Sequence, residues 1–448
     1  MQPKAVHSTK PASEHKLPPA ATGPVGLRAL QAIIRQKSTL AALELFHREL
    51  GDVFRFSLPG FKATVLVGPE ANRFVLVTRR DELHWRMERD PITKLLRHGL
   101  LVIDGEQHDT LCRLMTPAFH RRMLAQYVET MWRYTDQVSA AWADDRAIDM
   151  LDEIRRMAVL ILVGTMFKTD FTPELARLYP AVLRSLSYIS PGLWLFWPGA
   201  PRPGYQRALR QLDQYLHELI RLRRTSEQES DDLLGLLVAA PEVSDNLIRD
   251  QLFTMLIAGH DTSTALLAWA VYLLGQHPEA ATQAQAEVDA VLGEEPPAFE
   301  TLGRLTYLEQ VINETLRLYP PLHLGNRLAA VDLEFEGYHI PAGSRVMYSP
   351  YLTHRDPAYW PNPTRFEPER FAPAQSQNRP AYTFVPFGGG ARICLGVTFA
   401  QVEAKVILAR LLQKFDFSLL RPHVHMHMGV TIEPRPGVIM QIQRRSAA

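Results

Sequence analysis

The stretch FGGGARICLG, residues 387–396, places Cys394 behind a glycine-rich turn and at the predicted start of a helix. A helix N-terminus carries partial positive charge and free N–H groups, which stabilise a thiolate, and the thiolate is the form that binds metal. Gly390 and Gly396 allow the backbone to pass close to a flat or bulky group. Arg392 offers a planar fork of donors to a carboxylate. A lone cysteine is more often a buried inert thiol, but these neighbours favour a metal or cofactor ligand.

The overall composition is that of a globular protein with a sizeable core. The 448 residues include 49 basic and 48 acidic side chains, a formal net charge of +1, and 46% are hydrophobic and 22% charged. These values exclude disorder, collagen and coiled coil as the main state. The lack of a basic excess argues against a nucleic-acid partner. The two cysteines, Cys112 and Cys394, form no disulfide framework and suit a reducing compartment, so we expect a cytoplasmic protein.

No segment has the pattern of a signal peptide or a membrane anchor. Residues 1–20 lack the apolar run of a signal peptide and are expected to form a mobile arm before a single domain at 21–448. The 24 residues from Leu252 to Gly275 are long enough to span a bilayer. His260 and Asp261 lie in the middle of this run, where a charge in lipid is costly. We therefore expect a long helix in the core of a soluble protein, with no transmembrane segment.

The spacing of apolar residues predicts a mainly α-helical fold with a minor β region. Steps of three and four residues dominate from about 70 to 320, and short β-like runs between glycines and prolines follow. No repeat and no long linker divides the chain. The expected elements are a hairpin at 52–58 and 64–68 with its turn at Pro59-Gly60, helices at 206–224, 247–275, 278–292, 305–318 and 395–415, β-like runs at 327–350, and a β tail.

Two further segments carry polar residues at informative spacings. Glu314 and Arg317 are three residues apart and so share a helix face. Most such pairs are exposed and weak, and Arg370 is the candidate that would make them a network. Asp261 and Thr262 lie in the middle of the long apolar helix. A threonine hydroxyl there can open the helix hydrogen-bond ladder and admit water, and an aspartate can relay protons; a tolerated packing defect is the alternative.

Together these segments resemble the cytochrome P-450 family of haem-thiolate monooxygenases. The family string Phe-x-x-Gly-x-Arg-x-Cys-x-Gly is matched at every specified position by 387–396, and the Glu-x-x-Arg helix by 314–317. Ala-Gly-x-Asp-Thr at 258–262 and Pro-Glu-Arg-Phe at 368–371 also lie in the family's order. The resemblance covers the chain from about residue 17. It implies a triangular, mainly helical fold with haem between the long central helix and the cysteine loop.

The resemblance implies one cofactor, haem b (iron protoporphyrin IX), and residues that hold it. Cys394 would be the axial ligand of the iron, and its electron donation helps O–O cleavage. Phe387 would pack beside the ligand loop and tune the sulfur together with backbone N–H groups. Arg392, Arg327 and His108 would contact the haem propionates.

One position departs from the family pattern. In the segment 105–113, His108 fits the first propionate contact, but the second, usually arginine or another polar donor, is Cys112. Arg113 lies about 100° further round the helix and does not simply substitute. One propionate contact is therefore in doubt or left to water.

The resemblance separates structural from catalytic residues. Glu314, Arg317 and Arg370 would form the triad that locks the fold behind the haem. Asp261 and Thr262 match the acid–alcohol pair that supplies protons for O2 activation.

These roles imply an O2-dependent monooxygenase that hydroxylates or epoxidises an apolar substrate, such as a fatty acid, a terpenoid or a steroid-like molecule. The chain has no flavin or iron–sulfur segment, so its electrons are expected from a separate ferredoxin or flavodoxin-type donor with its reductase. Two alternatives stay open. A haem-thiolate peroxygenase or isomerase often lacks the acid–alcohol pair, and a non-enzymatic haem-binding sensor needs no proton relay. The expected type is the soluble, bacterial one.

Substrate contacts are expected where family pocket regions match this chain. These are the loop with Trp194, Phe196 and Trp197, the segment 83–101 and the segment 321–325. Their aromatic and aliphatic residues favour a lipid-like guest, although ordinary packing explains any single one of them equally well.

Two clusters of basic residues have both a functional and a plain interpretation. Four residues could steer an acidic electron donor toward the cysteine side or could be solvated surface: Arg113, Arg121, Arg122 and Lys405. Three imidazoles would share one face of an extended strand and could bind zinc or copper, but a polar strand face is the favoured interpretation: His423, His425 and His427.

Overall fold

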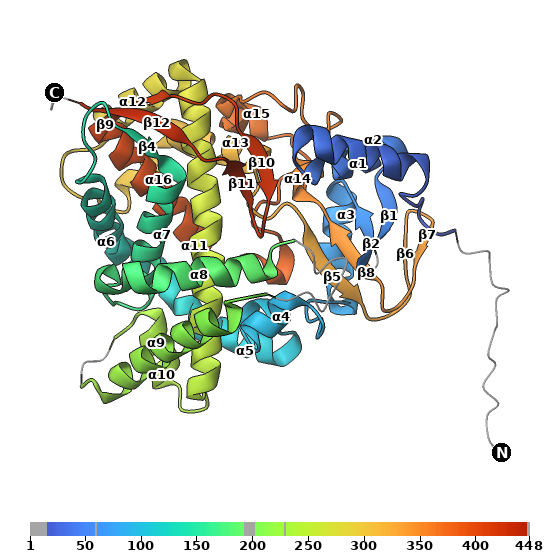
Figure 1. The fold of residues 1–448 in the computed structure, drawn as a ribbon, viewed down its shortest axis with the longest axis horizontal. Coiled ribbons are helices and arrows are strands. Elements are labelled where there is room, and N and C mark those ends of the chain that lie inside the picture. The colour runs from blue at the N-terminus through green and yellow to red at the C-terminus, as the bar shows by residue number, and fades with distance from the viewer. Residues whose placement is uncertain (1–15, 59–60, 192–201, 228–229, 446–448) are drawn as a thin grey trace.

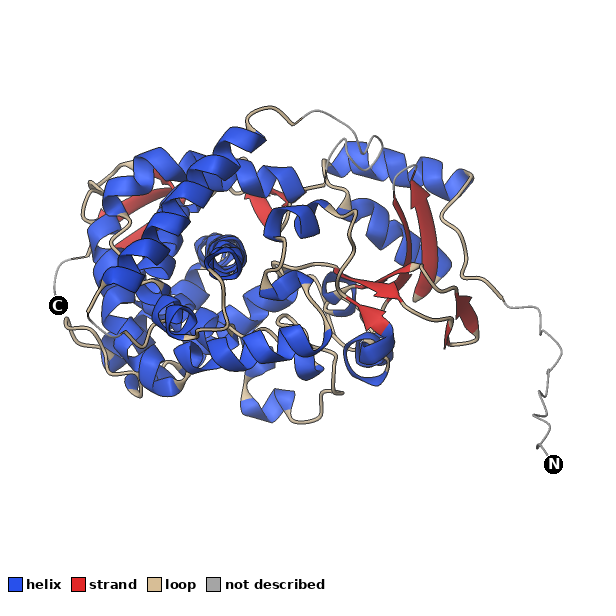
Figure 2. Cartoon of the chain, turned by 90° about the horizontal axis from the view of Figure 1, so that it is seen from below, coloured by secondary structure: helices blue, strands red, loops and turns tan. Residues whose placement is uncertain are grey.

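The fold consists of a large helical part and a smaller part built on a β-sheet (Figures 1 and 2). The computed structural model describes residues 16–58, 61–191, 202–227 and 230–445. The prediction of a mainly helical fold with a minor β region is confirmed. Within the described ranges, no helix combines the length and the apolar character that crossing a bilayer requires.

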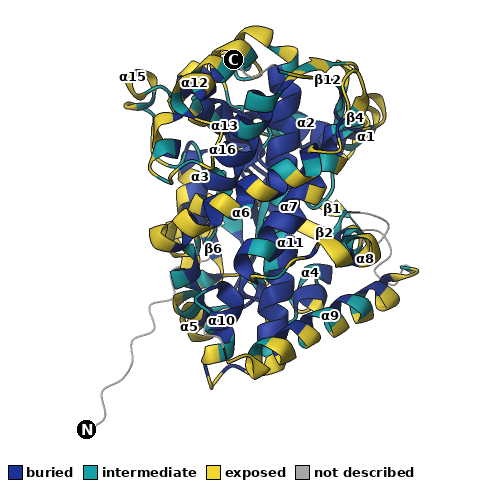
Figure 3. Ribbon diagram, turned by 90° about the vertical axis from the view of Figure 1, so that its left-hand side faces the viewer, coloured by how far each residue is buried: buried dark blue, intermediate teal, exposed yellow. Residues whose placement is uncertain are grey.

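The longest helix, α11 (Asp245–Gln276), is the axis of the helical part. At 1.5 Å per residue, its 32 residues extend over about 48 Å. A helix that is apolar on nearly every face is stable only when other elements surround it. Figure 2 looks along this helix, and Figure 3 shows that most of it is buried. The helices packed against it include α7 (Met150–Met166), α9 (Tyr205–Thr225), α13 (Thr306–Leu318) and α16 (Val397–Lys414).

The remaining helices complete the layers around this axis and cover the sheet. These helices are α1 (Pro24–Gln36), α2 (Leu40–Leu50), α3 (Pro69–Arg73), α4 (Pro91–Leu96), α5 (Gly105–Met115), α6 (Arg121–Ser139), α8 (Leu175–Ile189), α10 (Leu233–Ala239), α12 (Pro278–Val291), α14 (Pro350–Thr353) and α15 (Pro373–Ser376). Six of these eleven helices begin with proline, whose missing N–H costs nothing in the first helical turn.

The larger sheet has the strand order β1-β2-β8-β5-β3. Its members are β1 (Val53–Leu58), β2 (Phe61–Leu66), β8 (Arg345–Tyr348), β5 (Gly325–Ala329) and β3 (Leu83–His84). The predicted hairpin is confirmed, since β1 and β2 are antiparallel with Val53 opposite Leu66. The second strand starts three residues earlier than predicted, at Phe61. The predicted turn, Pro59-Gly60, lies outside the described residues.

The C-terminal part of the chain forms strands that return to the helical part. The last strand, β12 (Ile439–Arg444), is the centre of a three-stranded sheet between β4 (Ala147–Asp149) and β9 (Phe415–Leu419). The hairpin of β10 (His425–Met428) and β11 (Ile432–Arg435) packs against α11. A two-stranded sheet of β6 (Leu333–Phe335) and β7 (Tyr338–Ile340) completes the set. The strands β9 to β12 confirm the predicted β tail, and β11 of this tail contacts the central helix α11.

Candidate functional site

Cys394 lies in the turn that leads into α16. Its backbone N–H donates to the carbonyl of Phe387 at 2.9 Å, and the N–H of Val397 donates to the carbonyl of Cys394 at 3.3 Å. Gly396 is the N-cap of α16. The sulfur thus lies at the N-terminal end of an 18-residue helix, where the partial positive charge of the helix favours an anion.

Gly390 and Gly396 of the cysteine string have different surroundings. Gly390 has φ of 65°, and a Cβ there would lie 2.4 Å from the carbonyl oxygen of Leu76. Only glycine fits this left-handed position against the 74–78 segment. A Cβ at Gly396 would lie 4.0 Å from the Cys394 Sγ and 3.7 Å from the Phe119 ring. Both distances are ordinary van der Waals contacts, so a side chain at residue 396 would touch the sulfur without a clash.

The surroundings of Cys394 fit a metal ligand better than a free thiol. The residue is exposed, yet protein crowds the sulfur enough for burial to raise the pKa of its thiol, which a backbone hydrogen bond with Gly396 lowers in part. A bound metal ion removes this cost because a coordinating thiol is deprotonated outright. Within the described residues, no group of three histidine, cysteine or carboxylate ligands includes Cys394. A metal that takes one sulfur from the protein and its other ligands from a macrocycle fits this donor set.

Arg327 provides a buried positive charge suited to an acidic group of such a cofactor. The side chain is 2% exposed, and its guanidinium lies 3.5 Å from the Trp85 ring centroid. One N–H donates to the carbonyl of Asn326 at 2.7 Å. Burial lowers the pKa of Arg327 to about 10. Among the described residues no carboxylate forms an ion pair with it, so the site can accept an anion such as a propionate.

The other two predicted propionate contacts already have partners in the protein. Arg392 donates from Nη2 to Asp104 Oδ1 and to the carbonyl of Ile103, both at 2.7 Å. His108 is buried in α5, and its Nδ1 lies 2.9 Å from Asp109 Oδ1. Burial lowers the pKa of His108, so the ring is neutral at pH 7. Their role toward a propionate stays a prediction.

A cavity of about 210 Å³ connects these groups. Trp85, Asp104, Asp109, Arg327 and Arg392 all contribute to its lining. Two arginines and two carboxylates at one cavity provide donors for a bound acid and fixed acceptors that orient the guanidinium groups. The cavity brings together Arg327 and Arg392, two of the three predicted propionate contacts, whereas His108 does not line it.

A second, more voluminous cleft of about 1190 Å³ lies elsewhere. It is lined by residues 17–22, β1, β2, the 87–90 segment and the start of β8, and no residue of the cysteine loop lines it. We therefore place the chemistry at the cysteine loop and not in this cleft.

Glu314, Arg317 and Arg370 form one buried network. Glu314 and Arg317 are fully buried and joined by two hydrogen bonds of 2.7 Å, and Arg370 Nε lies 3.4 Å from Glu314 Oε1. Arg317 also donates to three carbonyls of the 354–365 coil, at 2.7 to 3.0 Å. The triad therefore ties α13 to the coil that precedes the cysteine loop. Its predicted role in fixing the fold is the one that this geometry supports.

Asp261 is a buried carboxyl on α11. It is 4% exposed, and its Oδ2 accepts a hydrogen bond of 2.9 Å from the Thr431 hydroxyl. Burial, reinforced by the nearby carboxylate of Glu433, raises the pKa of Asp261 to about 7. A group with that pKa exchanges its proton near neutral pH, as a proton relay must.

Thr262 and Gly259 lie in an unbroken part of α11. The Thr262 hydroxyl donates to the carbonyl of Ala258 at 2.7 Å, within the helix. A Cβ at Gly259 would lie 2.8 Å from Leu162 Cδ1, so this glycine allows α7 and α11 to approach closely. The expected opening of the hydrogen-bond ladder is not seen in this structure, and the glycine is explained by packing.

Sequence reasoning missed a second buried acid beside the relay pair. Glu403 of α16 is 1% exposed and accepts a hydrogen bond from the hydroxyl of Ser263, the residue after Thr262. Burial raises the pKa of Glu403 to about 8, so it is protonated at neutral pH. The signal was one acidic residue within an otherwise apolar helical stripe, but its partner is 140 residues away.

The basic residues proposed to steer an electron donor are largely neutralised by partners. Arg121 pairs with Glu300 at 2.7 Å, Arg122 with Asp231 at 3.0 Å, and Lys405 with Glu309 at 2.7 Å. Arg113 donates to the Thr110 hydroxyl at 3.1 Å. The first three cations carry little free charge toward a donor, which favours the plain interpretation for them.

The histidine run and the aromatic loop were the remaining candidate groups, and neither is placed at the cysteine loop. His425 and His427 are on β10 and His423 precedes it, as the strand-face interpretation expects. Trp194, Phe196 and Trp197 fall in the segment 192–201, outside the described residues.

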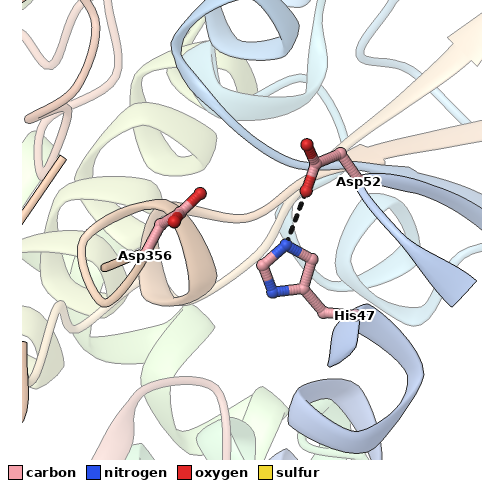
Figure 4. A group of neighbouring side chains, drawn as sticks. All are labelled: His47, Asp52 and Asp356. Carbon is pink, nitrogen blue, oxygen red and sulfur yellow. Dashed lines mark hydrogen bonds and ion pairs between the residues drawn. The ribbon is translucent and has the colours of Figure 1, made fainter. Parts of the chain in front are cut away.

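One group of potential metal ligands lies at the junction of α2, β1 and the turn after α14. His47 Nε2 is 2.7 Å from Asp52 Oδ1, and Asp356 faces them, with one ligand atom of each residue within 4.8 Å of the others (Figure 4). The imidazole is in the last turn of α2. The contact joins α2 to the start of β1, and we assign it this structural role.

A cysteine at a helix start and a buried arginine with no carboxylate partner among the described residues are features that haem-thiolate proteins share as a class. The family model described as Cytochrome P450 matches residues 18–441. The chain belongs to the cytochrome P-450 family, so its cofactor is haem and it is a monooxygenase.

Similar proteins support this assignment along nearly the whole chain. The chain is 34% identical to cyclooctatin synthase of Streptomyces melanosporofaciens over 382 residues, 82% of each chain. It is 31% identical to pentalenene oxygenase of Streptomyces avermitilis, over 82% of this chain and 84% of that protein. The structure of a cyanobacterial relative with retinoic acid bound, CYP120A1, superposes with a TM-score of 0.85 at 27% identity, over 96% of this chain and all of that one. The haem domain of cytochrome P450DA gives 0.86 at 26% identity, over 96% and 98%.

Proposed function

We propose that this protein hydroxylates or epoxidises a terpenoid with O2, and that a ferredoxin or flavodoxin-type donor with its reductase supplies the electrons. The proposed substrate class is supported by the names of similar proteins, which act on terpenoids. Three of the most similar curated proteins are cyclooctatin synthase, cyclooctat-9-en-7-ol 5-monooxygenase and pentalenene oxygenase, at 31–34% identity. A solved structural neighbour holds retinoic acid, which is also an isoprenoid.

The roles of the site residues follow from their positions. Bound haem supplies the one-electron and O2 chemistry. Cys394 would hold its iron from the N-terminal end of α16, and Arg327 would hold an acidic edge of the macrocycle beside Trp85. Asp261 keeps a proton available near neutral pH, and the Thr262 hydroxyl lies on the next residue of the same helix.

The acid–alcohol pair is also the reason to prefer O2 over peroxide as the oxidant. A buried aspartic acid with a pKa near 7 is costly to maintain and is useful where protons must be delivered during turnover. A peroxygenase receives both the oxygen atoms and the protons in hydrogen peroxide. A haem-binding sensor has no use for a proton relay.

The test begins with binding. The purified ferric protein is titrated with cyclic terpenes, fatty acids and steroids, and a shift of the Soret band reports displacement of water from the iron. We expect cyclic terpenes to give the shift. A response to fatty acids or steroids and none to terpenes would contradict the proposed substrate class.

Turnover then tests the reaction. With O2, a ferredoxin and its reductase, a binding terpene should gain one oxygen atom, and labelled O2 should supply it. Product formed with hydrogen peroxide alone, and none with O2 and reductant, would identify a peroxygenase. Replacement of Cys394 by alanine should abolish the band near 450 nm that the reduced, carbon-monoxide-bound protein is expected to show as a member of its family.

A further inference from the structure

Asp261 is not an isolated carboxyl on its helix but is held by the C-terminal hairpin. Thr431, which directly precedes β11, donates the hydrogen bond to Asp261 Oδ2 at 2.9 Å, across 170 residues of sequence. Both residues are at least nine-tenths buried. Because the neighbouring hydroxyl fixes one carboxyl oxygen, the orientation of Asp261 depends on the position of this hairpin.

A line of charged residues continues from this contact to the surface. Glu433, two residues beyond Thr431, forms an ion pair with Arg155 of α7 and a second one with Arg435 at 3.0 Å. Arg155 also contacts Asp152 at 3.4 Å. The side chains of Arg155 and Glu433 are less than a tenth exposed, whereas those of Arg435 and Asp152 are 42% and 64% exposed. Ion pairs thus connect Glu433, which is on the same hairpin as Thr431, to side chains that are exposed to solvent.

The groups that face Asp261 act on its proton in opposite directions. Burial and then the charge of Glu433 raise the pKa of Asp261, while the hydrogen bond from Thr431 and the charges of Arg155 and Arg435 lower it. The net result is a pKa of about 7.

Two further groups close the surroundings of Asp261. Burial lowers the pKa of His260 to about 3, so its imidazole is neutral. Burial also raises the pKa of Tyr179 of α8, whose ring centroid lies 5.8 Å from that of the His260 ring. Neither group changes its charge near neutral pH. Asp261 is therefore the member of the cluster that does.

We propose that the hairpin β10–β11 controls the proton relay of this enzyme: Thr431 orients the Asp261 carboxyl, and the Glu433–Arg155 ion pair sets the charge against which Asp261 gains and loses its proton. Thr431, Glu433 and Arg155 are positioning residues, since they act through Asp261. The inference rests on the relay role of Asp261 in the proposed function. The new element is that protons reach Asp261 from the side of the hairpin β10–β11.

The experiment follows the protonation of Asp261 directly in the haem-loaded ferric protein. Infrared difference spectra are recorded across neutral pH in the region where protonated carboxyl groups absorb. Subtraction of the Asp261→Asn spectrum isolates the band of Asp261 from those of other buried acids such as Glu403. The titration uses neither substrate nor electron donor, so its failure and failure of the terpenoid proposal are separate results.

Two substitutions should move the midpoint in opposite directions. Glu433→Gln removes a like charge and leaves Arg155 with the exposed Asp152 as its remaining ion-pair partner, so the midpoint of Asp261 should fall by about one pH unit. Thr431→Val removes a hydrogen bond to the charged form, so the midpoint should rise. Thr431→Ser keeps the hydroxyl and should leave the midpoint in place. Arg156→Gln, one residue further along α7 with a side chain 53% exposed, is the matched control and should have no effect.

The outcomes divide clearly. A midpoint that neither Glu433→Gln nor Thr431→Val moves, or that both move in one direction, overturns the proposal. If Glu433→Gln does not assemble with haem, Thr431→Val and Thr431→Ser decide. A rise with valine alone supports control by the hairpin, and equal midpoints for the two variants overturn it. The pH limit of turnover should follow the same midpoint as an independent readout.

Discussion

Replacement of Glu314 by glutamine should cost far more stability than the same change at an exposed ion pair. The substitution keeps the shape of the side chain but removes the charge that two hydrogen bonds of 2.7 Å connect to Arg317. It also weakens the contacts with Arg370 at 3.4 Å and with the backbone N–H of Glu367 at 3.0 Å. Glutamine presents an NH2 group where Arg317 needs an acceptor.

The magnitude follows from burial. Both Glu314 and Arg317 are 0% exposed, so loss of the acid leaves an uncompensated charge with no access to water. Breaking a buried ion pair from one side typically costs about 3–5 kcal/mol. Arg317 keeps three carbonyl acceptors, at His354, Pro363 and Arg365, so we expect about 3 kcal/mol, the lower end of that range. Domains are typically stable by about 5–15 kcal/mol, so the variant should retain the fold with a much reduced margin.

The assay is urea unfolding of the haem-loaded protein, followed by far-ultraviolet circular dichroism and extrapolated to zero denaturant. Glu218→Gln is the matched control, because Glu218 and Arg221 have the same three-residue spacing and a similar pair of hydrogen bonds on an exposed face of α9. We expect no measurable change for the control. A loss below about 1 kcal/mol for Glu314→Gln, or equal losses for the two variants, would refute the reasoning from burial.

Three further predictions concern the cofactor site and its buried acids. Gly390→Ala should lower haem retention several-fold, since its Cβ would lie 2.4 Å from the Leu76 carbonyl oxygen at φ of 65°; Gly303→Ala, where nothing lies within 4 Å, is the control, and equal retention would argue against the steric reason. Arg327→Gln should speed haem loss, measured by transfer to apomyoglobin, yet stabilise the haem-free protein, because it removes a buried charge that has no carboxylate partner among the described residues. Glu403 has a pKa of about 8 in the folded protein and ionises near 4.5 when unfolded, so the free energy of unfolding of the wild type should fall as pH rises between these values. Glu403→Gln should flatten this dependence of stability on pH. An unchanged dependence would show that the acid is not buried in solution.

The parts of the site that sequence could predict are those in which chemistry is local. The string 387–396 contains its own explanation: a turn that needs glycine at Gly390, a cysteine beside a helix start, and an arginine two residues before it. The long helix was predictable because an apolar run interrupted by His260 and Asp261 fits a buried core element. Glu314 and Arg317 were predictable as neighbours because helix periodicity places them on one face.

The parts that sequence could not predict depend on contacts between distant segments. Asp261 and Thr431 are 170 residues apart, and Arg392 and Asp104 are 288 apart, so no local pattern joins them. The steering hypothesis assumed that Arg121 is a charge without a partner. In the fold, a carboxylate oxygen of Glu300 lies 2.7 Å from its guanidinium. The sign of a surface charge is readable from sequence, but its compensation is a property of tertiary structure.

The position of β12 has a consequence for how this protein is made. This strand follows β4 by almost 300 residues in the chain, yet it is the middle member of their sheet, with β4 on one edge and β9 on the other. Until β12 is synthesised, β4 lacks the strand with which it pairs in this structure, although β4 was translated almost 300 residues earlier. The sheet can therefore close only after β12 has been translated, and deletion of β12 would split the sheet and free two strand edges for association with other chains.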